Sequence, residues 1–286
     1  SNSMELIGKK YNKPALSLTG GCDSKTTLSC IKNFDKYKYF SYISVKKEEP
    51  DAIAAHEISK ILGFKHKIYE IPDDLGYYPK YDLCKKIMEY NSGNIGSINI
   101  NDIKKRIFFS ENEDFEIEIK LWVFEVGRPY YHKRFGKKRM PKKVTPRILT
   151  TLYKVIINNK NLSTQPDKIF EEYLNKYYTD RDFNNIDWYD LMFWEYRVAA
   201  WNGLVITGEH LYSFDITIPY NNRILLRYLL STPLNHRIID KPHKDIQMKG
   251  NEKIANIGIS VQNVEHTKIR MIMEKIYFDI CSKFII

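Results

Sequence analysis

The first 71 residues alternate between strand-like and helical patterns, and this alternation constrains the fold more than any other feature. The strand-like segments are 14–19, 37–45 and 66–71, and the helical segments between them are 24–34 and 48–63. The first strand-like segment is small and apolar and runs into Gly20-Gly21, whereas the second is rich in aromatic and β-branched residues. A β-α-β-α-β order favours an α/β fold with a parallel, doubly wound sheet that binds ligands at the carboxyl ends of its strands. Ser44, at the end of the second segment, is therefore a candidate to line the ligand site.

The rest of the chain comprises one further predicted strand and a mainly helical half. Residues 115–124 alternate in the manner of a strand. From residue 145 onward the pattern becomes helical and aromatic, over 145–156, 165–178 and 187–201. The sequence thus predicts an α/β region over 4–140 and a mainly helical region over 141–286 packed on it, as two units or as one continuous domain.

Composition and cysteine usage favour a globular protein of the reducing cytoplasm. Of the 286 residues 43% are hydrophobic, and no run approaches the roughly 18 apolar residues that span a bilayer. The opening lacks the apolar stretch of a signal peptide. The four cysteines form no CxxC pair and are too few for a disulfide framework. We therefore expect a cytoplasmic protein without a membrane partner, and the sequence predicts no particular oligomeric state.

The charge of the chain is strongly basic. A net charge of +10 is compatible with nucleic acid, an anionic substrate or a membrane surface as partner. The longest basic run is 132–143, and the other basic residues are spread in small clusters. Because charge runs are usually solvated loops, a nucleic-acid partner is not favoured, although the charge leaves it open.

The turn Thr19-Gly20-Gly21-Cys22-Asp23-Ser24 has the chemistry of a phosphate-binding loop. Glycines let a backbone bend and approach a phosphate closely, and amides at the start of the next helix attract an anion. Ser24 offers a hydroxyl donor and Asp23 an oxygen ligand for Mg²⁺. The following Lys25-Thr26 pair does not complete a Walker A loop, because GxxxxGK[ST] requires glycine where Ser24 stands. A Gly-Gly turn with an Asp/Ser helix cap is the structural alternative.

The segment consists of a strand, the motif [S/T]GGxDS and a helix. In this order it resembles the pyrophosphate loop of the ATP pyrophosphatases, which cleave ATP between the α and β phosphates. The resemblance implies ATP and Mg²⁺ as ligands and a fold like that of the adenine nucleotide alpha hydrolases. It implies pyrophosphate binding by Thr19, Gly20, Gly21 and Ser24, with Asp23 on the metal. Ser44 joins the nucleotide-binding set through its place at the end of the second strand.

Within that superfamily the chain is similar to the synthetase domain of asparagine synthetases. Residues 49–66 look like the family's Asp-started helix, Leu-Gly and His-containing strand, and 218–222 sits where the family has Pro-Phe-Leu-Asp. Lys244 falls where the family carries the lysine that meets the phosphates and the acyl-adenylate. The resemblance covers roughly residues 14–250 and is strongest at the loop.

The chain departs from that family at its acidic second signature, Gly-Glu-Gly-x-Asp-Glu. Glu125 matches the final Glu, but Phe124 replaces the metal-binding Asp. Arg128 can compensate, because a guanidinium neutralises phosphate charge. The departure looks closer to relatives in polysaccharide or natural-product pathways. An N-terminal glutaminase nucleophile is absent, so we expect either a synthetase fragment or an enzyme supplied with nitrogen from elsewhere.

The resemblance implies a two-step amide synthesis. A carboxylate of a small molecule, saccharide or peptide attacks the α phosphate and pyrophosphate leaves, and ammonia or an amine, in one version from a separate glutaminase, then displaces AMP. Lys244 would stabilise the intermediate, Arg128 would bind phosphate, and Glu125 would orient or deprotonate the amine. The structural alternatives are a surface lysine for Lys244 and an ion pair between Glu125 and Arg128.

Two other classes stay open at this point. Enzymes that modify tRNA by thiolation or lysidine formation use the same loop, and the basic run favours them, although the chain has no paired catalytic cysteines. A non-catalytic nucleotide-binding relative is favoured by Phe124. The AMP-forming amide ligase remains the leading hypothesis.

Overall fold

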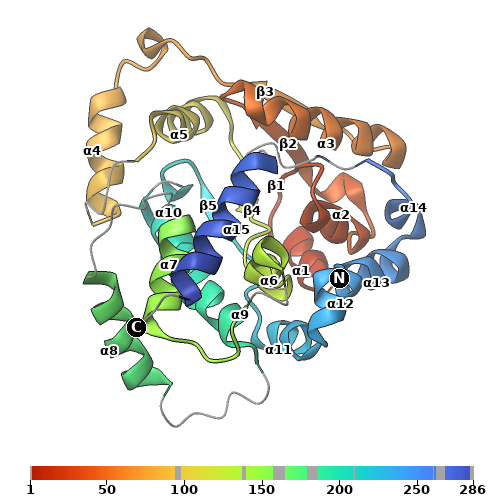
Figure 1. The fold of residues 1–286 in the computed structure, drawn as a ribbon. Coiled ribbons are helices and arrows are strands. Elements are labelled where there is room, and N and C mark those ends of the chain that lie inside the picture. Colours follow the sequence, from red (N-terminus) through yellow and green to blue (C-terminus); the bar gives the residue numbers. More distant parts are fainter. Residues whose placement is uncertain are drawn as a thin grey trace.

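A computed structural model describes residues 2–93, 98–136, 140–156, 165–178, 186–208, 210–259, 261 and 268–283. Its centre is a five-stranded, all-parallel sheet in the order β3-β2-β1-β4-β5 (Figure 1). The strands are β1 (Pro14–Ser17), β2 (Lys38–Ile43), β3 (Lys67–Glu70), β4 (Ile117–Ile119) and β5 (Asp215–Thr217). The predicted α/β class and the parallel pairing of the first three strands are confirmed, and the sheet is compatible with a doubly wound fold.

Two features of the sheet differ from the sequence-based expectation. The predicted strand over 115–124 is wrong beyond residue 119, because the chain turns there and forms a 3₁₀ helix, η4 (Phe124–Gly127). The sequence analysis also did not predict β5, which belongs to the mainly helical half and pairs with β4 from Ile117↔Asp215 to Ile119↔Thr217. The two halves of the chain therefore share one sheet.

Helices account for most of the remaining structure. Those of the first half are α1 (Asn2–Lys10), α2 (Cys22–Ser29), η1 (Phe34–Lys36), η2 (Lys46–Glu48), α3 (Glu49–Leu62), η3 (Leu75–Tyr77), α4 (Tyr81–Asn91), α5 (Ile100–Asn112) and α6 (Tyr130–Phe135). Those of the second half are α7 (Pro146–Ile156), α8 (Gln165–Tyr177), α9 (Trp188–Met192), the π-helical η6 (Phe193–Asn202), α10 (Gly203–Gly208), η7 (His210–Tyr212), α11 (Arg223–Ser231), α12 (Leu234–Ile238), α13 (Lys241–Gly250), α14 (Glu252–Ala255) and α15 (Lys268–Lys283). Each of these described helices is too short or too polar to cross a bilayer.

Alternate residues of each strand build the core on opposite faces of the sheet. Leu16 and Ile119 pack with side chains of α1, α2, α3 and α14 on one face. Ala15 and Phe40 point the other way and pack against Phe109 of α5. This is the pattern of a parallel sheet buried on both sides.

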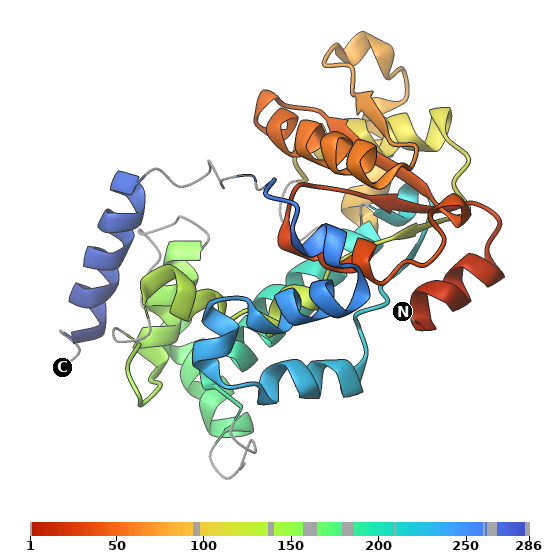
Figure 2. The same ribbon diagram turned by 90° about the vertical axis from the view of Figure 1, so that its right-hand side faces the viewer.

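The helical half has its own apolar core but returns to the sheet. Leu149 and Leu152 of α7 and Phe278 of α15 belong to this second core. The chain then runs back, and α13 and α14 pack against α2, as Figure 2 shows in blue beside the orange-red part of the ribbon. Side chains from residues 240–250 consequently reach the beginning of α2.

Candidate functional site

The loop Thr19–Ser24 lies at the carboxyl end of β1, the central strand of the sheet. The chain continues from β1 through α2 to β2 on one side, whereas β4 pairs with the other side of β1 (Figure 1). The strand order therefore reverses next to this loop. In open α/β sheets, ligands bind in the crevice at such a switch point.

Hydrogen bonds within the loop fix its shape. The Thr19 N–H donates to Ser24 Oγ over 3.0 Å, and the Gly21 N–H donates to Thr19 Oγ1 over 3.2 Å. The Gly20 N–H donates to Asp51 Oδ1 of α3 over 3.3 Å. Gly21 precedes α2 and has no side chain to cap the N-terminal amides of that helix.

The backbone angles of Gly20 and Gly21 do not require glycine, but the packing around Gly20 does. Gly21 is extended, with φ −73° and ψ 166°, and neither glycine has a positive φ. A Cβ on Gly20 would lie 2.7 Å from Ala54 Cβ and 2.7 Å from Val261 Cγ2, whereas a Cβ on Gly21 would meet only Thr19 Oγ1 at 3.0 Å. Gly20 is thus required by close packing of α3 and residue 261 against the loop.

Asp23, in the first turn of α2, points at cationic and polar groups from distant parts of the chain. Its Oδ2 lies 3.6 Å from Arg128 Nη1, and its Oδ1 lies 3.7 Å from His243 Nε2 of α13. The Oδ1 atom is buried and accepts no hydrogen bond. Burial raises the pKa of Asp23 above its ordinary value, and the charge of Arg128 opposes this shift.

Arg128 joins Asp23 to a second carboxylate, that of Asp240. Arg128 Nε donates to Asp240 Oδ1 over 3.0 Å, and Lys133 Nζ donates to Asp240 Oδ2 over 2.6 Å. Burial opposes ionisation of Asp240, but Lys133 and Arg128 together hold its pKa below the ordinary value. We call Asp23, Arg128, Lys133, Asp240 and His243 the loop network.

Three members of the loop network were not predicted from the sequence. Lys133 lies in the basic run 132–143, which was noted only as a whole. Asp240 and His243 lie in the segment DKPHK around Lys244. A search for charged residues within one helical turn of Lys244 could have found them, but nothing in that segment indicates which side chain faces the loop.

Backbone strain is concentrated beside the site. Among the described residues, Val123 (φ 75°) and Asp240 (φ 57°) are the non-glycine residues with positive φ. Val123 directly precedes η4, and Asp240 directly precedes α13. A left-handed conformation costs about 1–3 kcal/mol and is least suited to a β-branched residue, and such strain clusters at functional sites.

Glu125, in η4, is a partly buried carboxyl next to the loop network. Burial raises its pKa to about 7, and the charge of Asp23 acts in the same direction. The Asn202 side chain of η6 opposes this rise in the pKa of Glu125. Within the described residues Glu125 forms no ion pair with Arg128, which binds Asp23 and Asp240 instead. The ion pair considered as a structural alternative is therefore not formed.

Phe124 forms an apolar wall at the position where the resemblance would require an Asp. Its ring stacks on Tyr220 at a centroid distance of 4.2 Å and lies 4.3 Å from the His243 ring. The Tyr220 hydroxyl lies 2.5 Å from Thr27 Oγ1 of α2. The aromatic group anchors η4 and α13 to α2 and supplies no metal ligand.

Two predicted site residues have side chains that lie apart from the loop network. The Ser44 N–H and hydroxyl both donate to Glu48 Oε2, over 2.7 and 2.8 Å. Lys244 is exposed on α13, while its neighbour His243 is fully buried and faces Asp23. The structure thus gathers Thr19, Gly20, Gly21, Asp23, Ser24, Glu125 and Arg128 in one region. Lys244 meets the network through its backbone, whose N–H donates to the Asp240 carbonyl over 3.0 Å, while its side chain is exposed.

The residues present fit a magnesium ion held mainly by phosphates. Among the described residues, no group of three or more His, Cys, Asp or Glu side chains converges on one point. Mg²⁺ in phosphate sites commonly takes one or two carboxylates, with water and phosphate as the other ligands. The buried, unpartnered Oδ1 of Asp23 meets that requirement.

A second group of charges lies on the α5 face of the sheet. We call Arg106, Glu118, Lys120 and His210 the β4 cluster. Glu118 Oε1 is 2.5 Å from Lys120 Nζ, and its Oε2 is 3.8 Å from both Arg106 Nη1 and His210 Nδ1. Burial opposes ionisation of Glu118, but the nearby cations and His210 hold its pKa below the ordinary value. Burial lowers the pKa of Lys120 to about 8 despite this carboxylate.

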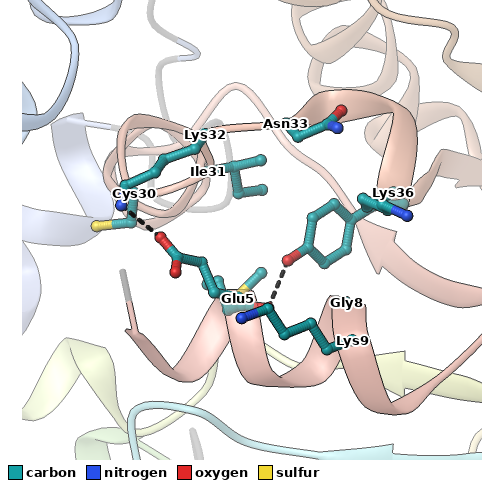
Figure 3. Close-up of a pocket in the computed structure, with 10 residues that line it drawn as sticks. Glu5, Gly8, Lys9, Cys30, Ile31, Lys32, Asn33 and Lys36 are labelled. Atoms are coloured by element: carbon teal, nitrogen blue, oxygen red, sulfur yellow. Dashed lines mark hydrogen bonds and ion pairs between the residues drawn. The ribbon is translucent and has the colours of Figure 1, made fainter.

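A cavity of about 290 Å³ lies at the far end of α2 from the loop (Figure 3). It is formed by α1 and the segment after α2, with Lys32 Nζ 2.6 Å from Glu5 Oε1 and the Tyr37 hydroxyl donating to the Met4 carbonyl. Because α2 runs back from the carboxyl end of β1, this cavity lies toward the opposite end of the strands from the loop. It takes no part in the loop network.

Comparison with known proteins adds no relative: no family model matches the chain, and no curated protein matches it. The functional assignment therefore rests on the sheet, the loop and the groups that converge on Asp23.

Proposed function

We propose that this protein is an ATP-dependent, AMP-forming ligase that adenylates a carboxylate and transfers ammonia or an amine to it. One observation carries the proposal. The loop Thr19–Ser24 lies at the switch point of a parallel sheet, with a buried, unpartnered Asp23 oxygen and the Arg128 guanidinium beside it. An N-terminal helix end, a cation and a free carboxylate oxygen are the groups that a magnesium–triphosphate needs.

Each group of the site has a role in this proposal. The loop and the first turn of α2 bind the β and γ phosphates. Arg128 neutralises charge that develops on the leaving pyrophosphate. Asp23 would hold Mg²⁺, which supplies further charge neutralisation on the phosphates.

The first step joins the substrate carboxylate to the α phosphate. A carboxylate oxygen attacks the α phosphorus, the bond to the bridging oxygen of the β phosphate breaks, and pyrophosphate leaves with that electron pair. In the second step a nitrogen attacks the acyl carbon and AMP leaves with the electrons of the acyl–oxygen bond. Glu125 accepts the nitrogen's proton, a role that suits a carboxyl whose pKa burial raises to about 7. A carboxylate of a small molecule, saccharide or peptide is the proposed acceptor.

The basic run gives little support to tRNA as the substrate. His132 contacts Asp187, Lys133 contacts Asp240 and Arg134 contacts Glu274. Residues 137–139 of the run lie outside the described residues. Because the His132 and Arg134 side chains are only 5% and 11% exposed and face carboxylates, they are poorly placed to bind an RNA backbone, and we advance no second function.

Calorimetric titration of ATP, with and without Mg²⁺, tests the proposal. We expect magnesium-dependent binding by the wild type that Asp23→Ala weakens by about tenfold or more, the scale of a lost charged contact. Asp82→Ala is the matched control, because Asp82 also lies in the first turn of a helix but is exposed. Release of AMP and pyrophosphate is then screened across carboxylates. A wild type that binds no ATP would overturn the proposal.

A further inference from the structure

Asp240 binds both cations that lie next to the phosphate loop. Arg128 donates to it over 3.0 Å and Lys133 over 2.6 Å, while Arg128 also reaches Asp23. Two carboxylates therefore balance two cations in the loop network. A polyphosphate at the loop would need those same cations, so its binding must compete with Asp240.

The geometry of Asp240 fits a group that can be displaced. Its φ of 57° is a left-handed conformation, and it lies between α12 and α13 rather than inside a helix. Its side chain is 18% exposed, and those of Arg128 and Lys133 are each 30% exposed. The ion pairs can consequently open toward solvent without unpacking the core.

A second observation points into the same place. The His243 side chain is fully buried, and neither of its ring nitrogens has a hydrogen-bond partner. Its Nε2 lies 3.7 Å from Asp23 Oδ1, which is also without a hydrogen-bond partner. Because buried polar atoms usually have hydrogen-bond partners, the facing His243 Nε2 and Asp23 Oδ1 atoms are suited to contact a polar ligand beside the loop.

We propose that Lys133 is a phosphate-binding residue and that Asp240 is its displaceable counter-ion, which holds Lys133 and Arg128 until a pyrophosphate group replaces it. This inference rests on the proposed function and adds two residues to it. The ligand class is a diphosphate, free or as part of ATP.

Titration with inorganic pyrophosphate and, separately, with ATP, both with Mg²⁺, tests this inference on four proteins. Lys133→Met keeps the apolar stem and removes the charge, and we expect about tenfold weaker binding of both ligands. Asp240→Asn keeps a residue that tolerates a left-handed backbone and removes the competing charge, so we expect binding about three- to tenfold tighter than in the wild type. Lys142→Met removes an exposed charge from the same basic run and should leave binding unchanged.

The sign of the Asp240→Asn effect decides between two roles. Tighter binding supports the counter-ion, and misfolding cannot produce it. Weaker binding overturns the counter-ion role and indicates that Asp240 is a direct ligand of the metal or phosphate. If the wild type binds ATP and neither Lys133→Met nor Asp240→Asn changes the affinity, this inference fails while the proposed function stands. If none of the four proteins binds either ligand, both fail.

Discussion

The loop network lies at the carboxyl end of β1 and the β4 cluster lies on the α5 face of the same sheet, and these two groups of charges differ most in their access to solvent. In the loop network the four side chains Asp23, Arg128, Lys133 and Asp240 are 18–30% exposed, and only His243 is fully buried. In the β4 cluster the side chains of Arg106, Glu118, Lys120 and His210 are 1–8% exposed. Similar residue types are therefore open in one place and enclosed in the other.

This difference in exposure suits the β4 cluster to stabilise the fold and the loop network to bind a ligand. The enclosed cluster has two cations around one carboxylate, and removing the carboxylate would leave buried charge uncompensated. The charged side chains of the open network are partly exposed, so they can exchange partners with a ligand. We therefore expect substitutions in the β4 cluster to affect stability, and substitutions in the loop network to affect binding.

The largest expected effect tests the structural side of this contrast. Glu118→Gln should lower the free energy of unfolding by about 3–5 kcal/mol, because Lys120 and Arg106 then lie buried without a counter-charge. Urea denaturation measures this loss. Asp114→Asn is the control, because Asp114 forms an exposed ion pair with Lys13. We expect it to change the unfolding free energy by less than about 1 kcal/mol. Equal losses of unfolding free energy in the two variants would contradict the conclusion that the buried carboxylate contributes more to stability than the exposed one.

A pair of alanine substitutions separates packing from binding within the loop itself. Gly20→Ala places a Cβ 2.7 Å from Ala54 and Val261 atoms, so we expect a loss of about 1–3 kcal/mol in unfolding free energy. Gly21→Ala meets only a threonine hydroxyl, and its extended backbone accepts alanine, so the fold should tolerate it. Denaturation and ATP titration of both variants check this. Loss of ATP binding by a stable Gly21→Ala protein would assign close phosphate approach to Gly21.

The raised pKa of Glu125 predicts that the unfolding free energy of the protein depends on pH, an effect of intermediate size. Its pKa is raised to about 7 in the folded protein from an ordinary 4.5, so the folded state holds a proton that the unfolded state releases between these values. Wild-type stability relative to Glu125→Gln should fall as pH rises from about 4.5 to 7 and then level off. We expect Glu125→Gln to be more stable by about 1–2 kcal/mol at pH 8.

Thermal or urea unfolding of Glu125→Gln across that pH range measures the difference, and Glu111→Gln is the control because Glu111 is exposed. A difference independent of pH would show that the Glu125 carboxyl titrates normally. Activity, once a substrate is known, should rise with pH through about 7 in the wild type, because proton acceptance requires the ionised form.

Lys244 carries the smallest expected effect. It is exposed on α13 and lies outside the loop network, so Lys244→Ala should change the unfolding free energy by less than about 0.5 kcal/mol. We also expect less than a twofold change in ATP affinity, measured beside Lys249→Ala, an exposed lysine on the same helix. A clear loss of ATP binding specific to Lys244→Ala would mean that α13 turns this lysine toward the phosphates when nucleotide binds.

The sequence by itself determined the parts of the structure that depend on local pattern. The apolar segment that ends at Gly20-Gly21 and the aromatic segment after it predicted parallel strands, because buried strands and amphipathic helices have distinct periodicities. The motif Thr19–Ser24 predicted a strand–turn–helix arrangement, and the structure has it, although α2 begins at Cys22 rather than at Ser24 and so includes Asp23 in its first turn.

Only the tertiary structure decided which charges meet and which are enclosed. Asp240 lies 112 residues from Arg128 in sequence. Whether His243 or Lys244 faces Asp23 depends on the rotation of α13 against α2. The three-residue strand β5 is too short to carry a periodic signal, yet its pairing with β4 completes the sheet. Local patterns set the elements, whereas long-range packing sets their rotation and contacts, and the loop network depends on that packing.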